Sequence, residues 1–301
     1  MAIVLLEKVF YNNNMKIIPY IKLLRVKHYI KNLFVFVPLI FSMSFLNLNL
    51  VGKAVIAFIQ FCLASSIIYI ANDICDVEKD RAHPKKKNRP IASGEISIKK
   101  ANYLEVFLIA LEILLMLLSK NIYVSITILS YLLMNFLYSF YLKKIPILDV
   151  MIIAIGFLLR IYAGAFAINV EVSHWLLLTA FSLSLFLGFG KRYGEKNKTN
   201  SNGREVLEGY DINSLKTFMI ISLSLTLVFY SLYCAAGDNI LGKNGILTVP
   251  IVIFAFFRYY LILGNEEIDG DPTDVILNDL PIKVSILAYA IVSIILVFGV
   301  K

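Results

Sequence analysis

The run AVIAFIQFCLASSIIYIA, at Ala54–Ala71, continues directly into NDICDVEKD, at Asn72–Asp80. An apolar run of this length suffices for a transmembrane helix, which needs roughly 17–25 mostly apolar residues. Similar apolar blocks recur at Leu33–Phe45, Tyr103–Leu118, Ile122–Leu142, Val150–Ile168, Trp175–Phe189, Phe218–Ala236, Ile246–Leu263 and Ile286–Val300. We therefore predict an all-α, polytopic membrane protein with about nine transmembrane helices.

The composition excludes an ordinary soluble protein. Of the 301 residues, 59% are hydrophobic and 17% are charged, whereas soluble domains have about 45–50% and about 25%. Lys and Arg number 29 against 21 Asp and Glu, an excess that on a soluble protein would suggest nucleic-acid binding. Here 23 of the basic residues lie on the side of the predicted N-terminus and 4 on the other side. The positive-inside rule then predicts a cytoplasmic N-terminus, an outer C-terminus and no nucleic-acid partner.

The chain is expected to form a single transmembrane domain over residues 1–301. Residues 1–31 are a cytoplasmic or interfacial lead-in, and residues 72–100 and 190–216 are cytoplasmic loops that carry motifs. The three Cys and three His residues are scattered without metal-ligand spacing, so neither a disulfide framework nor a histidine metal site is expected. Because polar residues gather in the inner loops, we expect a polar cavity that faces the cytoplasm, in the inner (cell) membrane.

The acidic residues after the quoted apolar run suggest a metal site. Asp73, Asp76 and Asp80 fall at i, i+3 and i+7, on one face if the helix continues through them. Carboxylate oxygens beside the Asn72 amide suit Mg²⁺, which also retains waters and phosphate oxygens. The alternative is a solvated helix end whose acids pair with neighbouring basic residues. A carboxylate next to membrane depth is expensive, which favours a metal site that binds phosphate.

Basic residues follow these acids and recur at the end of the sixth predicted span. Lys87 and Arg89 stand within reach of a phosphate bound by the metal. Alternatively, these basic residues only set the positive-inside topology or contact anionic lipid head groups. Lys191 and Arg192 would meet the lipid–water boundary, either as ligands of an anionic group or as snorkelling anchors.

Two ionisable residues mark the predicted span at Val150–Ile168. Arg160 lies well inside it and needs a partner there, either a lipid phosphate or a structural ion pair. Asp149 begins the helix, as an ordinary N-terminal charge or as a catalytic group. The acidic stretch from Glu266 to Asp279 leaves local function or partner contact open.

Two segments resemble a known family. The pattern Asn72-Asp73-x-x-Asp76-x-x-x-Asp80, followed by RPIASG at residues 89–94, resembles the first aspartate motif of the UbiA superfamily of intramembrane prenyltransferases. The similarity extends over nearly the whole chain and includes the early Arg25, Lys31, Asn32 segment. Three elements are most similar to the polyprenyl-phosphate phosphoribosyltransferase branch: DVEKDRAHP at residues 76–84, GKRYGE at 190–195 and GDPTD at 270–274.

This resemblance implies a UbiA-like bundle, Mg²⁺ as cofactor, and transfer of 5-phosphoribosyl from phosphoribosyl diphosphate to a polyprenyl (decaprenyl-like) phosphate, with release of diphosphate. Asp73, Asp76 and Asp80 would hold the metal and serve catalysis. The candidate substrate-binding residues are Lys31, Asn32, Asn72, Arg81, Lys87, Arg89, Arg160, Lys191, Arg192, Tyr193 and Glu195. Homo-oligomerisation is left open.

The chain departs from the superfamily pattern at one point. Aromatic prenyltransferases of the superfamily usually carry a second aspartate-rich motif after the sixth span, but here Glu195 is the single acid beside Lys191 and Arg192. One acidic motif opposite a basic one suits a metal-bound sugar diphosphate and a lipid monophosphate. Prenyl transfer to an aromatic acceptor is the alternative. A transporter or non-catalytic lipid-binding protein is the second alternative, disfavoured because the ionisable groups gather at one face rather than near the midplane.

Overall fold

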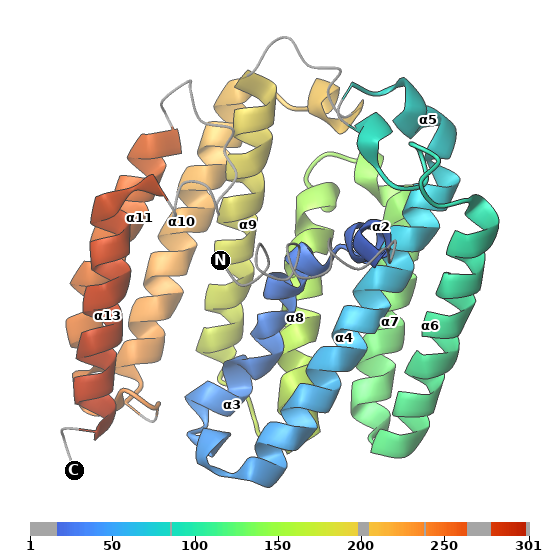
Figure 1. Cartoon of the computed structure of the whole chain (residues 1–301). Coiled ribbons are helices and arrows are strands. Elements are labelled where there is room, and N and C mark those ends of the chain that lie inside the picture. The colour runs from blue at the N-terminus through green and yellow to red at the C-terminus, as the bar shows by residue number, and fades with distance from the viewer. Residues whose placement is uncertain (1–16, 85, 198–204, 238, 264–277, 299–301) are drawn as a thin grey trace.

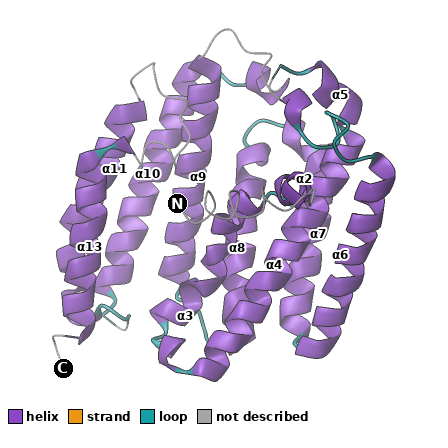
Figure 2. Ribbon diagram, viewed as in Figure 1, coloured by secondary structure: helices purple, strands orange, loops and turns teal. Residues whose placement is uncertain are grey.

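The computed structural model describes residues 17–84, 86–197, 205–237, 239–263 and 278–298, and within these ranges it contains helices but no strand (Figure 2). Figure 1 shows the long helices standing side by side as a bundle. The elements in chain order are α2 (Ile17–Leu23), η1 (Val26–Phe36), α3 (Val37–Phe41), η2 (Ser44–Leu46), α4 (Leu48–Cys75), α5 (Val77–Ala82), η3 (Lys86–Asn88), α6 (Ile98–Ser119), α7 (Ile122–Phe140), η4 (Leu142–Lys144), α8 (Leu148–Ile168), α9 (His174–Asn197), η5 (Glu205–Gly209), α10 (Ile212–Ala235), η6 (Gly242–Thr248), α11 (Val249–Leu263) and α13 (Leu280–Phe298).

Eight helices in the described part of the chain are long and apolar enough to cross a membrane. They are α4, α6, α7, α8, α9, α10, the joined η6 and α11, and α13. Each overlaps with nearly all of one predicted apolar block. The prediction of an all-helical, multi-pass membrane bundle is therefore confirmed, while the count of nine spans stays a prediction.

The first apolar block, Leu33–Phe45, is not a continuous α-helix. The chain forms an 11-residue 3₁₀ helix, η1, which passes into the 5-residue α3 where Pro38 stands at its start. The chain runs from α2, near mid-height of the bundle, to α3 at its lower end (Figure 1). This block therefore does not form a regular membrane-spanning helix.

The ends of the long helices follow from their capping residues. Asn47 accepts hydrogen bonds from the backbone N–H groups of Asn49 and Leu50 at the start of α4. Asn121 and Asp211 cap α7 and α10 in the same way. A side-chain oxygen at this position satisfies one of the backbone donors that the first helical turn leaves unpaired.

Two helices form the centre of the bundle and others form its periphery. Of the membrane-spanning helices, α4 and α8 are the most buried, and each packs against η1 and α7 as well as against the other. Most of α6 and α13 is exposed and apolar, as expected of surfaces that face lipid. Since lipid provides no hydrophobic force between helices, close packing and polar contacts must hold the centre together.

One close approach holds η1 against α8. A Cβ atom built on Gly164 would lie 1.9 Å from the backbone oxygen of Val35. Gly164→Ala is therefore expected to lower stability by about 1–3 kcal/mol, because the two backbones must separate. Thermal unfolding in detergent measures this effect. Gly52→Ala is the matched control, since a Cβ there meets nothing within 4 Å, and equal loss of stability in the two variants would contradict the prediction.

Candidate active site

The described parts of the predicted inner loops at residues 72–100, 143–149 and 205–216 lie at one end of the bundle, the upper end in Figure 1. The end of α4, the short α5 and the start of α8 meet there. Two ion pairs join loops that are distant in sequence: Lys143 Nζ lies 3.8 Å from Asp76 Oδ2, and Lys144 Nζ lies 2.9 Å from Glu205 Oε2. The fold thus brings the separate polar motifs to a common face.

The acidic motif does not continue as a single helix. Helix α4 ends at Cys75 and α5 begins at Val77, with Asp76 between them at φ −94° and ψ 10°. The expected arrangement of three carboxylates along one uninterrupted helical face is therefore wrong. The break still brings Asp73 and Asp80 together, because both accept hydrogen bonds from Arg89.

Asp73 and Asp80 form the centre of the site, with two arginines. Arg89 Nη1 lies 3.1 Å from Asp73 Oδ1 and 2.7 Å from Asp80 Oδ2, so the two carboxylates flank the same nitrogen atom. Arg25 Nη2 donates to Asp73 Oδ1 at 2.6 Å. The aspartates are 2% and 3% exposed, so these charge-assisted bonds offset the loss of their hydration.

Arg25 is a site residue that no motif in the sequence links to the aspartates. It lies 48 residues from Asp73 and adopts a left-handed backbone, φ 53°, just before η1. Its guanidinium carbon also lies 4.5 Å from the centre of the Tyr69 ring, one helical turn before Asp73 on α4. The conformation and the ring together aim the guanidinium group at the acidic motif.

The third predicted carboxylate stands apart from this pair. Asp76 is partly exposed and faces Lys143 rather than Arg89. In the described ranges no group of three or more His, Cys, Asp and Glu side chains is placed to hold a metal. Mg²⁺, however, is commonly held by one or two carboxylates together with substrate phosphates and waters. The oxygen donors of Asp73 and Asp80, which flank one nitrogen atom, fit that requirement, and the metal role of all three aspartates stays a prediction.

Of the other predicted residues near the motif, Asn72 is partly buried, whereas Arg81 and Lys87 are exposed. Lys31 is also exposed but lies on η1, beside Asn32. Arg81 donates to Glu78 Oε1 at 2.8 Å and, more weakly, to the backbone oxygen of Ala92 at 3.4 Å. It therefore helps to hold the loop that carries Arg89.

A second polar cluster lies inside the protein where α8 begins. Arg192 Nε donates to Asp149 Oδ2 at 2.7 Å, and Arg192 Nη1 donates to Glu195 Oε2 at 2.8 Å. Tyr210 donates its hydroxyl to Asp149 Oδ1 at 2.6 Å and accepts the backbone N–H of Ile147. Asp149 is 0% and Arg192 2% exposed. Burial raises the pKa of the Tyr210 hydroxyl, so it remains a proton donor to the carboxylate.

This cluster shows where the residues of the predicted basic motif lie. Arg192 is occupied by protein carboxylates, and Tyr193 is buried in the hydrophobic core with Lys216 Nζ 5.7 Å from the centre of its ring. Glu195 is partly exposed beside Arg192, and Lys191 is partly buried at the same end of α9. Their binding of substrate stays a prediction. What the geometry supports directly is a role for Arg192 in fixing the start of α8.

Arg160 forms a third cluster, deep inside the bundle. Its guanidinium group donates to Asn32 Oδ1 at 2.8 Å, to the backbone oxygen of Gly156 at 2.7 Å and to the Tyr131 hydroxyl at 3.1 Å. The rings of Phe61, Tyr131 and Phe157 surround it at 4.8–5.6 Å. All these partners are neutral, so of the two alternatives for Arg160 the structural ion pair does not form within the described ranges. Binding of a lipid phosphate stays a prediction.

The end of the acidic stretch has a structural role. Asp279 Oδ2 lies 2.9 Å from Arg258 Nη2, and Asp279 Oδ1 accepts the backbone N–H of Ile282 at the start of α13. The hydrogen bond from Arg258 lowers the pKa of Asp279. Residues 264–277, which include the GDPTD element, lie outside the described residues, as do Lys85 and most of the polar loop after α9.

Known proteins are similar to this chain in both sequence and fold. Residues 34–272 match the UbiA prenyltransferase family. The decaprenyl-phosphate phosphoribosyltransferase of Corynebacterium glutamicum is 34% identical over 89% of this chain and 83% of its own, and that of Mycolicibacterium smegmatis is 33% identical over 89% of each. A UbiA homologue from Archaeoglobus fulgidus, solved with DMAPP and Mg²⁺, superposes with a TM-score of 0.65 at 17% identity, covering 94% of this chain and 99% of that one.

Proposed function

The chain belongs to the UbiA prenyltransferase family, and we propose that within it the protein transfers 5-phosphoribosyl from phosphoribosyl diphosphate to a polyprenyl phosphate and releases diphosphate. The observation that carries this proposal is the similarity to decaprenyl-phosphate phosphoribosyltransferases over 83–89% of their length. A match of that extent covers most of the chain rather than one shared motif.

The second polar cluster supports the same assignment. Near the end of α9, the acid Glu195 binds Arg192, which in turn binds Asp149. These side chains satisfy one another instead of presenting a second set of carboxylates to a metal. A site with one carboxylate pair and several cations suits a sugar diphosphate and a lipid monophosphate, because both ligands are anionic.

Asp73 and Asp80, with Asp76 beside them, would hold Mg²⁺ in this reaction. When bound, the metal neutralises charge that develops on the departing diphosphate. Arg25 and Arg89 lie within 3.1 Å of Asp73 and are partly exposed, so they can contact diphosphate oxygens as well as the carboxylates. Lys143, at 3.8 Å from Asp76, adds a third cation at this end.

The chemistry requires no general base. An oxygen of the polyprenyl phosphate, already ionised at neutral pH, forms the new bond to C1 of the ribose as the bond from C1 to diphosphate breaks. The protein then contributes mainly by positioning the two substrates and by electrostatic stabilisation of the leaving group. A reaction without a general base explains why the described contacts at this end of the bundle join carboxylates and arginines. Within those contacts there is no histidine or serine nucleophile.

The proposed orientation puts this end of the bundle in the cytoplasm. Basic residues of the described loops at 72–100 and 143–149 lie at this end (Figure 1), and a phosphorylated sugar donor is soluble in the cytoplasm. The N-terminus would then lie in the cytoplasm and the polyprenyl tail between the helices and the surrounding lipid.

A substrate panel tests the proposal directly. Purified protein in detergent is expected to form phosphoribosyl polyprenyl phosphate only when phosphoribosyl diphosphate and polyprenyl phosphate are both present, as read by mass analysis of the products. Consumption of a prenyl diphosphate with an aromatic acceptor, with phosphoribosyl diphosphate left unchanged, would support the alternative prenyl transfer.

Removal of divalent metal is expected to lower phosphoribosyl transfer by about 100-fold or more, because the leaving diphosphate would lose its principal electrostatic partner. Initial rates after treatment with a chelator measure the loss, and added Mg²⁺ should restore the activity. Transfer that proceeds undiminished in excess chelator would contradict the metal assignment.

A further inference from the structure

The loop between α7 and α8 carries Lys143, and one residue of this loop has an unfavourable backbone conformation. Ile147 adopts φ 70° and ψ −50° immediately before α8 begins. These angles are close to those at the centre of a γ-turn of the rare, strained kind. A β-branched side chain makes a positive φ still less favourable. Contacts from elsewhere in the fold must therefore hold the loop in this conformation.

The hydroxyl group of Tyr210 provides two such contacts. It accepts a hydrogen bond from the backbone N–H of Ile147 and donates one to Asp149 Oδ1 at 2.6 Å. Asp149 is itself held by Arg192 Nε at 2.7 Å, so the hydroxyl connects the strained residue to a carboxylate that a second helix fixes. The hydroxyl acts both as donor and as acceptor here, and a phenylalanine at this position could provide neither bond.

Two further contacts join the same loop to residues 205–210, which we call the clamp segment. A Cβ atom built on Gly209 would lie 2.5 Å from Pro146 Cγ, so the backbone of the clamp segment packs directly against that proline ring. Lys144 Nζ lies 2.9 Å from Glu205 Oε2. The clamp segment therefore contacts the loop at several positions between Lys143 and the start of α8.

The clamp segment is in turn anchored to the interior of the bundle. Val206, Leu207 and Tyr210 are buried, and the Tyr210 ring packs against the ring of Phe189 on α9. Lys196 Nζ, also on α9, donates to the backbone oxygen of Leu207 at 3.0 Å. Since α9 fixes the clamp segment, the position of Tyr210 does not depend on the loop that it holds.

The loop held in this way places Lys143 beside the acidic motif. Its Nζ atom lies 3.8 Å from Asp76 Oδ2, and both side chains are partly exposed. An ammonium group has three N–H donors, so it can contact a bound anion as well as this carboxylate. A change of φ at Ile147 would turn the preceding residues relative to α8 and would move Lys143 away from Asp76.

We propose that Tyr210 is a positioning residue, whose hydroxyl group holds the strained turn at Ile147 and so keeps Lys143 where it can contact the diphosphate of the donor. The inference rests on the proposed function, because the diphosphate comes from that reaction. Tyr210 acts through Lys143 and needs no contact with the substrate.

Hydrogen exchange of the full-length protein in detergent tests the hold on the loop. In Tyr210→Phe, which keeps the buried ring, the amides of residues 142–148 are expected to exchange about tenfold faster than in the native protein, because a hydrogen bond that holds this loop is lost. Unchanged exchange of the loop in Tyr210→Phe would overturn the proposal, whichever reaction the protein catalyses.

Calorimetric titration with inorganic diphosphate in the presence of Mg²⁺ tests the effect on Lys143. Diphosphate is released both in phosphoribosyl transfer and in the alternative prenyl transfer. Tyr210→Phe and Lys143→Met are each expected to weaken its binding about tenfold, since one charge-assisted contact is lost in either variant. The double variant is expected to bind as weakly as Lys143→Met alone, because the hydroxyl acts through the lysine.

The outcomes of this titration separate the proposal from the proposed function. If Tyr210→Phe weakened binding by the same factor with and without Lys143, its effect would be general rather than transmitted through the lysine, and the proposal would be overturned. Absence of diphosphate binding by the native protein would instead contradict the proposed function on which the inference rests.

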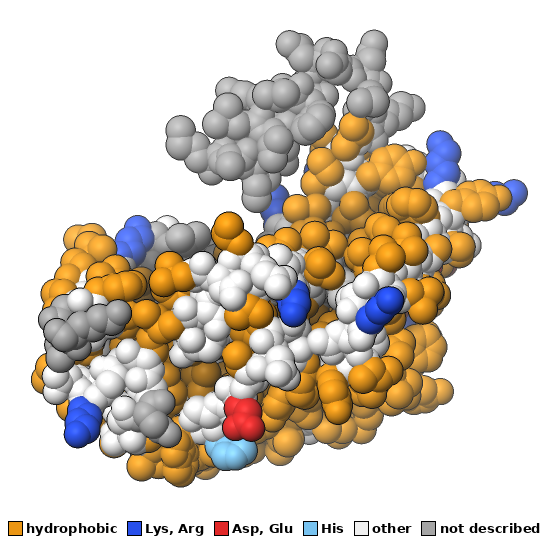
Figure 3. Space-filling model, turned by 90° about the horizontal axis from the view of Figure 1, so that it is seen from below, with side chains coloured by type: hydrophobic (Ala, Val, Ile, Leu, Met, Phe, Trp, Pro, Cys, Tyr) orange, Lys and Arg blue, Asp and Glu red, His pale blue; other side chains and the backbone are white. Residues whose placement is uncertain are grey.

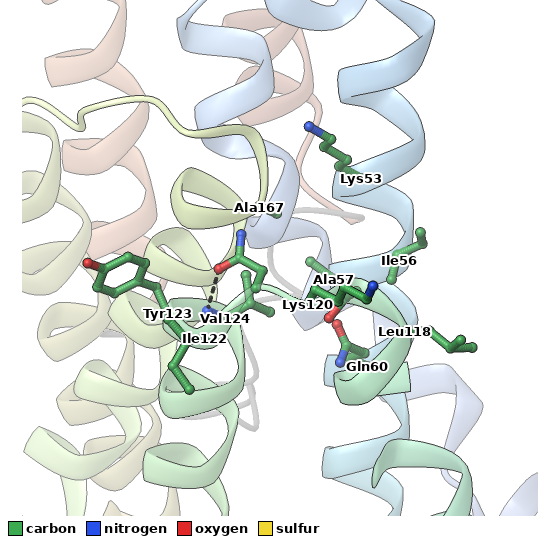
Figure 4. Close-up of a pocket in the computed structure, with 12 residues that line it drawn as sticks. Lys53, Ile56, Ala57, Gln60, Leu118, Lys120, Ile122, Tyr123, Val124 and Ala167 are labelled. Atoms are coloured by element: carbon green, nitrogen blue, oxygen red, sulfur yellow. Dashed lines mark hydrogen bonds between the residues drawn. The ribbon is translucent and has the colours of Figure 1, made fainter. Parts of the chain in front are cut away.

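Asn121→Ala, at the opposite end of the bundle, is the matched control. That end shows mainly apolar side chains with scattered basic ones (Figure 3). Asn121 accepts the backbone N–H of Val124 and donates to the backbone oxygen of Phe166 at 2.8 Å, in a turn beside a cavity of about 480 Å³ (Figure 4). The control thus also removes two hydrogen bonds that hold a turn, and diphosphate binding should stay at the native level. Equal weakening in Asn121→Ala and Tyr210→Phe would attribute both effects to lost stability and would overturn the proposal.

Discussion

Asp73→Asn is expected to lower the rate of phosphoribosyl transfer by about 100-fold or more. The substitution keeps the shape of the side chain but removes the negative charge that Arg25 and Arg89 contact at 2.6 Å and 3.1 Å. An amide oxygen is a weaker ligand for Mg²⁺ than a carboxylate, so the predicted metal site would lose one of its two buried donors. Initial rates with labelled phosphoribosyl diphosphate and polyprenyl phosphate in detergent measure the change.

The matched control for this variant is Asp211→Asn, which also removes one carboxylate near the same end of the bundle. Asp211 caps α10 and is exposed, with a pKa lowered by hydrogen bonds from Ser214. Because asparagine is also a good helix cap, we expect this control to retain both activity and stability. Transfer at the native rate by Asp73→Asn would exclude Asp73 from the metal site. Unfolding of Asp73→Asn, seen in size-exclusion chromatography, would instead identify a structural role.

Arg192→Met is expected to lower the free energy of unfolding by about 3–5 kcal/mol, because it leaves the fully buried Asp149 without its cation. Methionine has a similar length, so loss of packing is small by comparison. Thermal or denaturant-induced unfolding in detergent provides the measurement. The hydrogen bond from Tyr210 to Asp149 remains in the variant and cannot by itself neutralise the carboxylate.

The double variant Asp149→Leu/Arg192→Met separates charge from packing. Since a buried ion pair is often replaceable by apolar residues at little cost, we expect the double variant to regain most of the stability lost in Arg192→Met. If the double variant were as unstable as the single one, the effect would come from packing around α8 and α9 rather than from the unpaired carboxylate.

The membrane fold was predictable because its signal is local. A run of about 20 apolar residues specifies a membrane-spanning helix without reference to the rest of the chain, and blocks such as Ala54–Ala71 and Val150–Ile168 lie within α4 and α8. The first block was the exception. Its 3₁₀ winding and its close contact with Gly164 depend on α8, which no local pattern in residues 33–45 encodes.

The composition of the site was only partly predictable. Asp73, Asp80 and Arg89 are recognisable because they lie within one short segment, and the fold does bring these three together. Arg25 belongs to the early segment of the family resemblance, and no pattern in the sequence pairs Lys143 with an aspartate. Their contacts with Asp73 and Asp76 join residues 48 and 67 positions apart, so helix packing alone determines them.

The amino-acid sequence by itself determined that the chain is a helical membrane protein and which family it belongs to, and it singled out the acidic segment that we propose carries the chemistry. Hydropathy and short motifs could do this because they act within one helix or loop. Only the tertiary structure decided how the charges are paired. It placed Arg25 and Arg89 on Asp73, and it turned Asp149 and Arg192 inward to Tyr210 and Glu195. The reason is physical: in a bundle, a charge near membrane depth takes its partner from whichever helix packs beside it, and that neighbour is set by the whole fold.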